Sequence, residues 1–285
     1  MSEIRTTVIL PAYRAWTTLP AALEALRPQV DRPDRELVLV ESSGEASQQE
    51  LADRWPWARV IAPAERTLPG RARNLAVREA RGELLAFTDA DAVAEPEWLD
   101  ELERALTDDV DGVAGAVLNG ASESVVGTAD YLLEFSDWLP QRRLPLLHGA
   151  TCNLLLRRAV LEGAGFPEDV WPGEDTIVTF RLGAEGRLAF APRARIRHTG
   201  RTRFRDFLDH QRQLGAAFGT VCETVDFPFG SLARRRYGPL LPAFRVVGVV
   251  RRIRGNRPVI KAALRASPLI AIGAVAWSTG LIRAR

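Results

Sequence analysis

In the first 110 residues, two patterns of apolar and polar positions follow one another in turn. Short apolar runs, typical of strands buried on both faces, are followed by stretches with apolar residues three or four positions apart, typical of helices. The strand runs are Thr6–Leu10, Glu36–Val40, Ala58–Ala62 and Glu83–Thr88. The helical stretches are 17–27, Gln48–Arg54, Gly70–Arg81 and Pro96–Leu106. This alternation predicts an α/β fold with a parallel sheet covered by helices.

Beyond residue 110 the pattern is looser. It predicts strands at Gly112–Leu118, Arg187–Ala191 and Ala194–Arg197, with a loop at Leu144–Asn153 leading into the apolar run Leu154–Leu156. It predicts helices at Val125–Trp138, from near Glu174, and at Arg203–Phe218. We therefore expect a first domain over 1–225, in two parts at 1–110 and 111–225, followed by a helical extension over 226–285.

The extension contains two apolar stretches, Tyr237–Val250 and Pro268–Ile282, each bounded by arginines. The second has 15 uncharged residues, fewer than the roughly 20 needed to cross a bilayer. A pair of helices lying in the interface of an anionic membrane is the favoured interpretation. Packing on the catalytic domain or on another subunit is the alternative.

Charge supports the distinction between the two parts. Residues 231–285 hold 12 Lys and Arg and no Asp or Glu, although the whole chain carries only +2. This asymmetry indicates an anionic partner, with a solvated basic tail as the alternative. A nucleic-acid partner is not expected, because the tail shows no stacking platform. The two cysteines have no Cys-x-x-Cys spacing, and the first residues show no secretory signal, so a cytoplasmic location is expected, at the inner face of the membrane if the extension binds lipid.

Carboxylates follow the fourth predicted strand. Ligands of parallel α/β sheets bind beyond the carboxyl ends of the strands, where Asp89 and Asp91 should meet the residues that follow the other strands. Two carboxylates suit a hard divalent cation, Mn²⁺ or Mg²⁺, which also takes phosphate oxygens. A helix N-cap is the alternative for such acids.

Two further acids and one histidine carry possible chemistry. Glu174 and Asp175 precede an apolar helical stretch, where they either complement the helix dipole or supply a general base. His198 follows a predicted strand and is a possible metal ligand, although a lone histidine is more often structural.

The order of these motifs resembles family-2 glycosyltransferases, which have a GT-A fold. The segments that carry the resemblance, over roughly residues 5–215, are TVILPAY, a strand ending in an acid and Ser-Ser, GRARNLAVREARGELLAFTDADA, GATCNLLLRRAVLEGAGF, GEDTIVTFRL and IRH. The resemblance implies a nucleotide-binding, Rossmann-like mixed sheet flanked by helices. It implies that 1–225 is a catalytic domain, with a nucleotide-binding part at 1–110 and an acceptor-binding part at 111–225. It also implies an inverting enzyme that moves a sugar from a nucleotide-diphosphate sugar to an acceptor hydroxyl.

The resemblance also implies roles for individual residues. The nucleotide sugar would contact Pro11, Ala12, Tyr13, Glu41, Arg73, Asn74, Asp89, Ala90 and Asp91. The metal would be held by Asp91 and His198. Asp175 would be the general base with Glu174 beside it, and the acceptor would be lined by Gly149, Ala150, Asn153 and Glu174. Glu41 stands where relatives have Asp, which leaves the base of the donor open, with uracil as the default.

Physical reasoning favours the same reaction. A nucleotide diphosphate is already a good leaving group, so a metal ion and one separate base suffice. A single in-line displacement should invert the anomeric centre. The acceptor would be lipid-linked or a precursor of a cell-envelope glycan. The alternatives are a nucleotidyltransferase, which normally has a Gly-rich loop that PAYRAWTTLP lacks, and a non-catalytic nucleotide-sugar binding protein.

Overall fold

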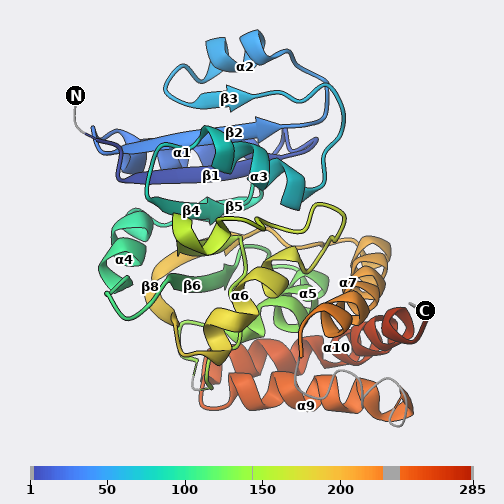
Figure 1. Cartoon of the computed structure of the whole chain (residues 1–285). Helices are drawn as coiled ribbons and strands as arrows, with labels where there is room; N and C mark the ends of the chain where they lie inside the picture. The colour runs from blue at the N-terminus through green and yellow to red at the C-terminus, as the bar shows by residue number, and fades with distance from the viewer. Residues whose placement is uncertain (1–2, 143, 227–237, 284–285) are drawn as a thin grey trace. The chain divides into compact units, whose positions relative to one another are not determined.

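The computed structural model describes residues 3–142, 144–226 and 238–283. Its strands are β1 Thr6–Ala12, β2 Arg35–Glu41, β3 Arg59–Ile61, β4 Leu84–Thr88, β5 Ala92–Ala94, β6 Gly112–Asn119, β7 Asn153–Arg157 and β8 Leu188–His198 (Figure 1). Its α-helices are α1 Leu19–Val30, α2 Gln48–Arg54, α3 Pro69–Glu79, α4 Trp98–Ala105, α5 Val125–Phe135, α6 Glu174–Ala184, α7 Phe204–Thr224, α9 Leu241–Ile253 and α10 Arg257–Arg283. The predicted α/β class is confirmed.

The strands form one mixed sheet in the order β3-β2-β1-β4-β7-β6-β8-β5. The four strands β3, β2, β1 and β4 are parallel, while β7 runs antiparallel to both β4 and β6. Ala12 at the end of β1 pairs with Glu41 at the end of β2. The carboxyl ends of β1 and β2 therefore reach the same edge of the sheet.

Local sequence explains the elements of the parallel half. All seven residues of β2 are buried, as a central strand requires. On α1, Leu19, Leu23 and Leu26 are buried at helical spacing. Helix α2 begins with a capping box in which Ser47 and Glu50 bond reciprocally.

Three predictions beyond β4 need correction. The short strand β5, which the sequence pattern does not predict, follows Asp91 directly. The two strands predicted at 187–191 and 194–197 are one strand, β8, because Pro192 does not interrupt it. The loop predicted up to Asn153 ends one residue earlier, since Asn153 already belongs to β7.

The chain forms two compact units that differ from the expected domains. Unit 1 comprises residues 1–116 and 146–197, and unit 2 comprises 117–145 and 198–285. Helices α5 and α7, which the sequence pattern assigns to the catalytic domain, belong to unit 2 with α9 and α10. The boundary expected at residue 225 is therefore not a boundary between compact units. The division of 1–225 into nucleotide and acceptor parts stays a prediction.

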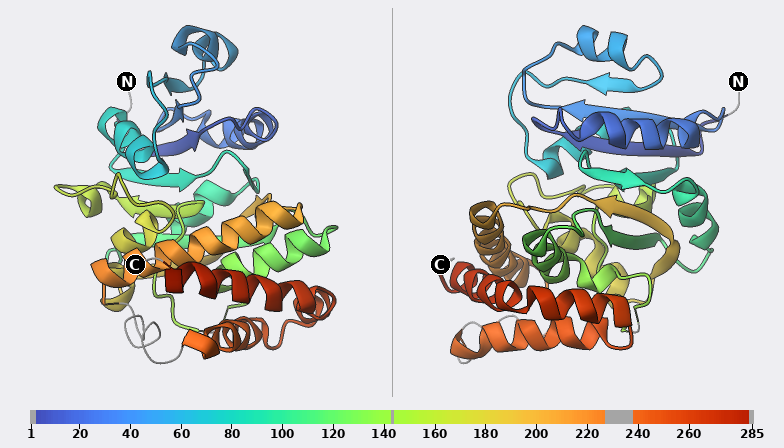
Figure 2. Two further views of the ribbon diagram at one scale, coloured as in Figure 1. Left: turned by 90° about the vertical axis from the view of Figure 1, so that its right-hand side faces the viewer. Right: turned by 180° about the vertical axis from the view of Figure 1, so that it is seen from behind.

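Helix α10 is the centre of unit 2 and packs on α5, α7 and α9 (Figure 2). Its crossing with α7 is close. A Cβ on Gly215 of α7 would collide with the carbonyl of Trp277, and a Cβ on Gly280 would collide with the carbonyl of Arg212. Only glycine permits this approach of two helix backbones.

The two predicted C-terminal helices are present with different bounds. The first is α9, which begins at Leu241, and the second is α10, which extends back to Arg257 and contains Pro268. Tyr237 and Arg234–Arg236, which the prediction includes, lie outside the described residues.

Candidate active site

The edge formed by the ends of β1 and β2 holds a buried carboxylate. Glu41 is 1% exposed, and its Oε1 accepts a hydrogen bond of 3.1 Å from the amide of Ser43. Its Oε2 is buried and has no hydrogen-bond partner among the described residues. Next to it, Ala12 is buried and accepts a bond of 3.0 Å from the amide of Ser42, and Pro11 is half-buried. A buried carboxylate oxygen without a donor is costly, so it points to an N–H or O–H of a ligand.

Tyr13 follows β1 and is 37% exposed. Two guanidinium groups lie over its ring, with the Cζ of Arg66 4.5 Å and that of Arg14 5.5 Å from the ring centroid. Arg14 has a φ of 51°, in the left-handed region that non-glycine residues rarely adopt. Glu45 stabilises this turn, because it pairs with Arg14 at 3.0 Å and accepts a bond of 2.6 Å from the indole of Trp16. Sequence reasoning identified Tyr13 but missed the two arginines, which carry no motif.

Arg73 links the end of β4 to the start of α6. It is 3% exposed, and its Nη2 donates to Asp89 at 2.9 Å while its Nη1 donates to Glu174 at 2.5 Å. These carboxylates raise the pKa of Arg73 despite its burial, so it stays charged. Burial raises the pKa of Glu174 to about 7, opposed by Arg73 and reinforced by Asp175.

This ion pair changes the expected role of Glu174. The side chain is 3% exposed, so it does not face an acceptor, contrary to the expectation from the sequence. It instead fixes Arg73, and through Arg73 the orientation of Asp89. We therefore treat Glu174 as a positioning residue.

Asn74 is also engaged within the protein. Its Nδ2 donates to the carbonyl of Phe166 at 2.9 Å and to Glu168 at 3.0 Å, and its Oδ1 accepts from the amide of Phe166 at 2.9 Å. These bonds hold the segment that precedes α6. The expected contact of Asn74 with the nucleotide stays a prediction.

Asp89 and Asp91 lie on the turn between β4 and β5, where the amide of Ala92 donates to the carbonyl of Asp89 at 3.1 Å. Both are half-buried, with Ala90 buried between them, and their carboxylates offer ligand atoms within 4.8 Å of each other. Oxygen donors at this separation suit a hard divalent ion, so this pair can hold one. A helix N-cap is excluded as their role, because a strand follows them.

His198 is the last residue of β8, the neighbour of β5 in the sheet. It is 6% exposed and is grouped with unit 2. There its ring centroid lies 4.6 Å from that of Phe135, and its carbonyl accepts a bond of 2.9 Å from Gly120.

Asp175 lies in the first turn of α6 and is half-buried. Its Oδ2 accepts a bond of 3.2 Å from the amide of Thr151, and its Oδ1 accepts one of 2.6 Å from the amide of Thr176. Gly173, with a φ of 111°, makes the turn that starts the helix. Backbone donors thus orient a carboxylate that is still partly accessible, as a general base requires.

The expected acceptor-lining residues differ in accessibility. Gly149 exchanges hydrogen bonds with the hydroxyl of Thr179 on α6, and Ala150 is 8% exposed. Asn153 is 1% exposed, and its Oδ1 accepts from the indole of Trp98 at 2.7 Å. Its Nδ2 donates to two strand carbonyls, those of Ala116 and Ala194. Asn153 therefore links neighbouring strands inside the protein, and we do not propose it as an acceptor contact.

Other buried polar atoms in segments beside this edge lack partners among the described residues. They are the Oγ1 of Thr67 before α3, the Nε of Arg73 and the Oγ1 of Thr88 at the end of β4.

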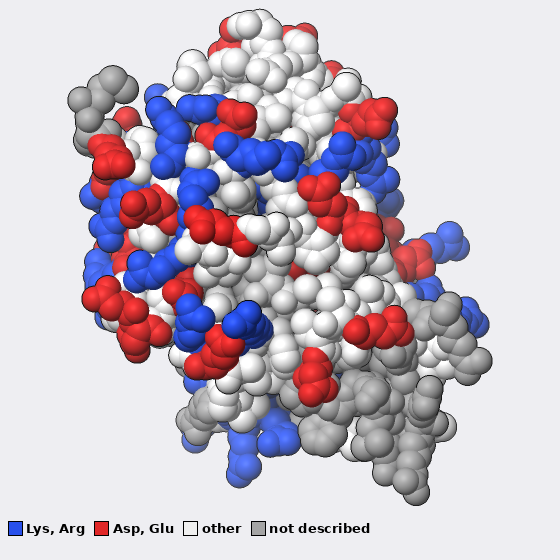
Figure 3. All heavy atoms as spheres, viewed as in Figure 1, with Lys and Arg blue, Asp and Glu red and all other residues white. Residues whose placement is uncertain are grey.

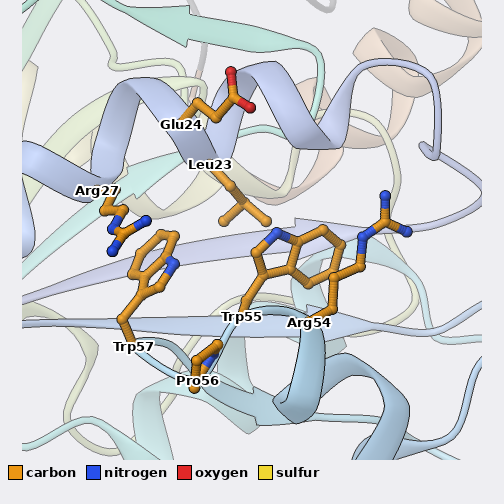
Figure 4. A pocket seen from close by; sticks show the side chains of 7 residues that line it. All are labelled: Leu23, Glu24, Arg27, Arg54, Trp55, Pro56 and Trp57. Atoms are coloured by element: carbon orange, nitrogen blue, oxygen red, sulfur yellow. The ribbon is translucent and has the colours of Figure 1, made fainter.

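Two features elsewhere do not extend the site. A pocket of about 270 Å³ lies between α1 and the segment before β3, at the amino end of that strand (Figure 4). Its lining residues are Leu23, Glu24, Arg27, Arg54, Trp55, Pro56 and Trp57. It is thus at the opposite edge of the sheet from Glu41.

In unit 2, Asp130, Glu134 and His210 offer ligand atoms within 4.8 Å of one another. Burial and the charge of Glu134 raise the pKa of Asp130. Burial acts against ionisation of Glu134, but His210 and Arg201 lower its pKa to about 2. Arg201 pairs with Glu134 at 3.3 Å and Gln211 donates to Asp130 at 3.2 Å, so protein groups already satisfy this cluster.

Comparison with known proteins gives a consistent result. The sequence model of the family described as "Glycosyl transferase family 2" matches residues 7–163, more than half of the chain. No curated protein matches the sequence.

Three solved structures illustrate the similarity of fold. A mannosyltransferase from Pyrobaculum calidifontis, in complex with GDP-Man and Mn²⁺, has 18% identity and a TM-score of 0.65, over 99% of this chain and 88% of that one. Residues 1–349 of TarS from S. aureus, with UDP-GlcNAc, have 16% identity and a TM-score of 0.54, over 98% and 90%. Glucosyl-3-phosphoglycerate synthase from Mycobacterium tuberculosis, with Mn²⁺, UDP-Glc and phosphoglyceric acid, has 21% identity and a TM-score of 0.54, over 78% and 81%. The GT-A-type fold implied by the sequence is thereby confirmed.

Proposed function

Because the chain belongs to glycosyl transferase family 2, we propose that it transfers a sugar from a nucleotide-diphosphate sugar to an acceptor hydroxyl with inversion. Family membership makes it a glycosyltransferase, and therefore an enzyme of the transferase class. The observation that carries the proposal is the acidic pair Asp89 and Asp91, which lies directly beyond a buried parallel strand, linked by Arg73 to the helix that presents Asp175.

The donor would bind along the edge that ends β1, β2 and β4. The unpartnered Oε2 of Glu41 supports recognition of an N–H of the base. Pro11, Ala12 and Tyr13 would line the base, and Arg66 and Arg14 beside Tyr13 would add positive charge for the diphosphate. The base stays open, with uracil as the default, since the similar structures were solved with GDP-Man, UDP-GlcNAc or UDP-Glc.

Asp91 is the proposed metal ligand, with His198 as a second ligand and Asp89 on the nucleotide side. The carboxylate pair fits Mn²⁺ or Mg²⁺ by its hard oxygen donors. When bound, such an ion neutralises charge on the departing diphosphate. The role of Arg73 is to hold Asp89 in one orientation and to keep a fixed positive charge beside it.

Asp175 is the proposed general base, which removes the proton from the acceptor hydroxyl. The acceptor oxygen attacks the anomeric carbon as the bond from that carbon to the diphosphate oxygen breaks, and the acceptor proton passes to the Asp175 carboxylate. One displacement from the face opposite the leaving group inverts the anomeric centre. Gly149 and Ala150, near the start of α6, are the proposed neighbours of the acceptor.

Ligand binding is tested by thermal shift. UDP, GDP and their sugars are added with and without Mn²⁺, and a nucleotide that binds only the folded state raises the melting temperature. We expect the largest shift with a uridine nucleotide and Mn²⁺. The absence of a shift with every nucleotide and ion would contradict the proposal.

Catalysis is tested by substitution of the base. Asp175→Asn should lower kcat at least about a hundredfold while the nucleotide-dependent thermal shift persists. Asp169→Asn, at an exposed acid near α6, is the matched control. Proton NMR of the product should show the inverted anomer, and retention of configuration would refute the mechanism.

The acceptor is proposed to be lipid-linked or a cell-envelope glycan precursor, reached at the cytoplasmic face of the membrane. The acid-free basic segment 231–285 supports a peripheral contact with anionic lipid. The test is a comparison of transfer to matched acceptors that differ only in the presence of a lipid chain. Equal transfer to both would argue against a lipid-linked acceptor.

A further inference from the structure

The outward face of α9 is apolar. Large side chains at helical spacing share this face and are more than half exposed: Leu240 at 51%, Phe244 at 58%, Val247 at 53% and Val250 at 57%. Arg251 and Arg254, both exposed, continue the same face toward the end of the helix. The opposite face holds the buried Leu241, Val249 and Ile253. The helix thus has an apolar stripe on both sides, and the described residues cover only one of them.

Helix α10 shows the same arrangement over a greater length. Its exposed large apolar side chains are Leu264 at 69%, Ile272 at 43%, Val275 at 54% and Ile282 at 43%. They are separated by eight, three and seven residues, which are close to whole helical turns, so they lie on one face of the helix. Lys261 and Arg265 flank this face near its start, and no charged residue occurs between Arg265 and Arg283.

The other face of α10 is packed against protein. Gly273 meets the side chains of Leu133 on α5 and Phe207 on α7, and Trp277 packs on Phe218 with ring centroids 5.3 Å apart. Within the part of the chain that the structure describes, α10 is the one helix long and apolar enough to cross a membrane. Because α10 packs along one side on α7, which carries charged residues, we take α10 to lie in the membrane interface rather than to span the bilayer.

These stripes concentrate the exposed apolar surface of the described chain. Eight of its fourteen exposed large hydrophobic residues lie between Leu240 and Ile282. Contiguous exposed apolar surface marks an interaction site on a soluble domain.

The charge of the residues around the two apolar stripes indicates which kind of partner would bind them. Residues 238–283 contain arginine and lysine but no Asp or Glu. Basic side chains at the lower edge of Figure 3, where α9 and α10 lie in Figure 1, have no acidic side chains between them, whereas both signs are mixed over unit 1. Apolar stripes bordered only by positive charge complement a surface of lipid phosphates over acyl chains.

We infer that α9 and α10 form a docking surface that lies in the plane of an anionic bilayer, with their apolar stripes inserted at the boundary between headgroups and acyl chains. Arg251, Arg254, Lys261 and Arg265 contact lipid phosphates. The inference rests on the proposed function, because it names the surface through which the enzyme reaches a lipid-linked acceptor.

The test is flotation of the full chain with vesicles of phosphatidylcholine alone or mixed with phosphatidylglycerol. The apolar stripes are changed by Val247→Glu with Val250→Glu on α9, and by Ile272→Glu with Val275→Glu on α10. All four side chains are at least 43% exposed, so the fold should tolerate them. Each pair should lower the partition coefficient about tenfold or more. Val125→Glu, at a 49% exposed residue of α5, is the matched control and should bind as the unchanged chain does.

The basic residues are tested separately. Arg251→Gln and Arg254→Gln should each lower binding to the anionic vesicles about fivefold at low salt and leave binding to phosphatidylcholine unchanged. Equal loss on both vesicles would overturn the assignment of these arginines to phosphate contacts.

Three results would overturn the docking surface: no flotation of the unchanged chain, full flotation of both Glu pairs, or a dimer in light scattering that the Glu pairs dissociate. Vesicle-bound protein that resists an alkaline carbonate wash would overturn the in-plane arrangement. Thermal shift with UDP and Mn²⁺ is measured on the same variants. A retained shift with lost flotation supports the inference, while flotation without any nucleotide shift refutes only the proposed transferase chemistry.

Discussion

Replacing Glu174 by glutamine should alter how the stability of the protein depends on pH. The pKa of Glu174 rises from 4.5 to about 7 in the folded protein, because the side chain is 3% exposed. The folded state then binds the proton more tightly than the unfolded state, so this group lowers stability as pH rises from about 4.5 to above 7. At 1.36 kcal/mol per pH unit, the whole effect amounts to about 3 kcal/mol. The glutamine side chain of the variant has no proton equilibrium and can still accept a hydrogen bond from Arg73.

The free energy of unfolding of Glu174→Gln relative to the unchanged chain should therefore increase by about 2 to 3 kcal/mol between about pH 5 and about pH 8. Urea unfolding at several pH values measures this free energy. The contributions of the other titrating groups cancel when the two proteins are compared. Glu162→Gln, at an exposed glutamate outside this network, should give a constant difference. A constant difference for Glu174→Gln, or one that grows toward acid, would refute the reasoning.

Three further outcomes follow from contacts in the structure. Asn153→Ala should lower the free energy of unfolding by at least about 2 kcal/mol, because the indole of Trp98 and two strand carbonyls lose their buried partner; urea unfolding measures this. Asp91→Asn should abolish the part of the UDP-induced thermal shift that depends on Mn²⁺, as EDTA should for the unchanged chain, and a persisting shift would count against Asp91 as a ligand. Gly215→Ala should destabilise the chain by about 1 to 3 kcal/mol, because its Cβ meets the backbone at Trp277, and an unchanged melting temperature would contradict this.

The elements of the parallel half could be predicted because their signals are local. The buried run of β2 reads directly as a central strand, and Ser47 with Glu50 marks the start of α2. The three-residue β5 has no such signal, because its pairing depends on β8, about a hundred positions later. The turn that carries Asp89 and Asp91 was nevertheless located, since it depends only on where β4 ends.

Side-chain roles were harder to predict than positions. Glu174 lies at the start of a helix, as the sequence indicates, but its partner Arg73 lies 101 positions away and removes it from the acceptor side. Asn74 likewise bonds to Phe166, 92 positions later. Only the folded chain reveals such partners, because single-sequence patterns carry information about neighbours along the helix or strand. The site assignments of Asp175 and His198 stay predictions.

Both units are assembled from two separate stretches of chain, and this has a consequence for folding. Unit 1 lacks β7 and α6 until residues 146–197 are in place, and unit 2 combines 117–145 with residues after 197. No single cut in the chain separates the two units, because a continuous fragment that contains all of unit 1 also contains residues 117–145 of unit 2. Contacts that close loops of about a hundred residues also form slowly. Refolding from denaturant should therefore be slow and sensitive to protein concentration, since apolar faces of both partly assembled units remain open to aggregation while distant segments find one another.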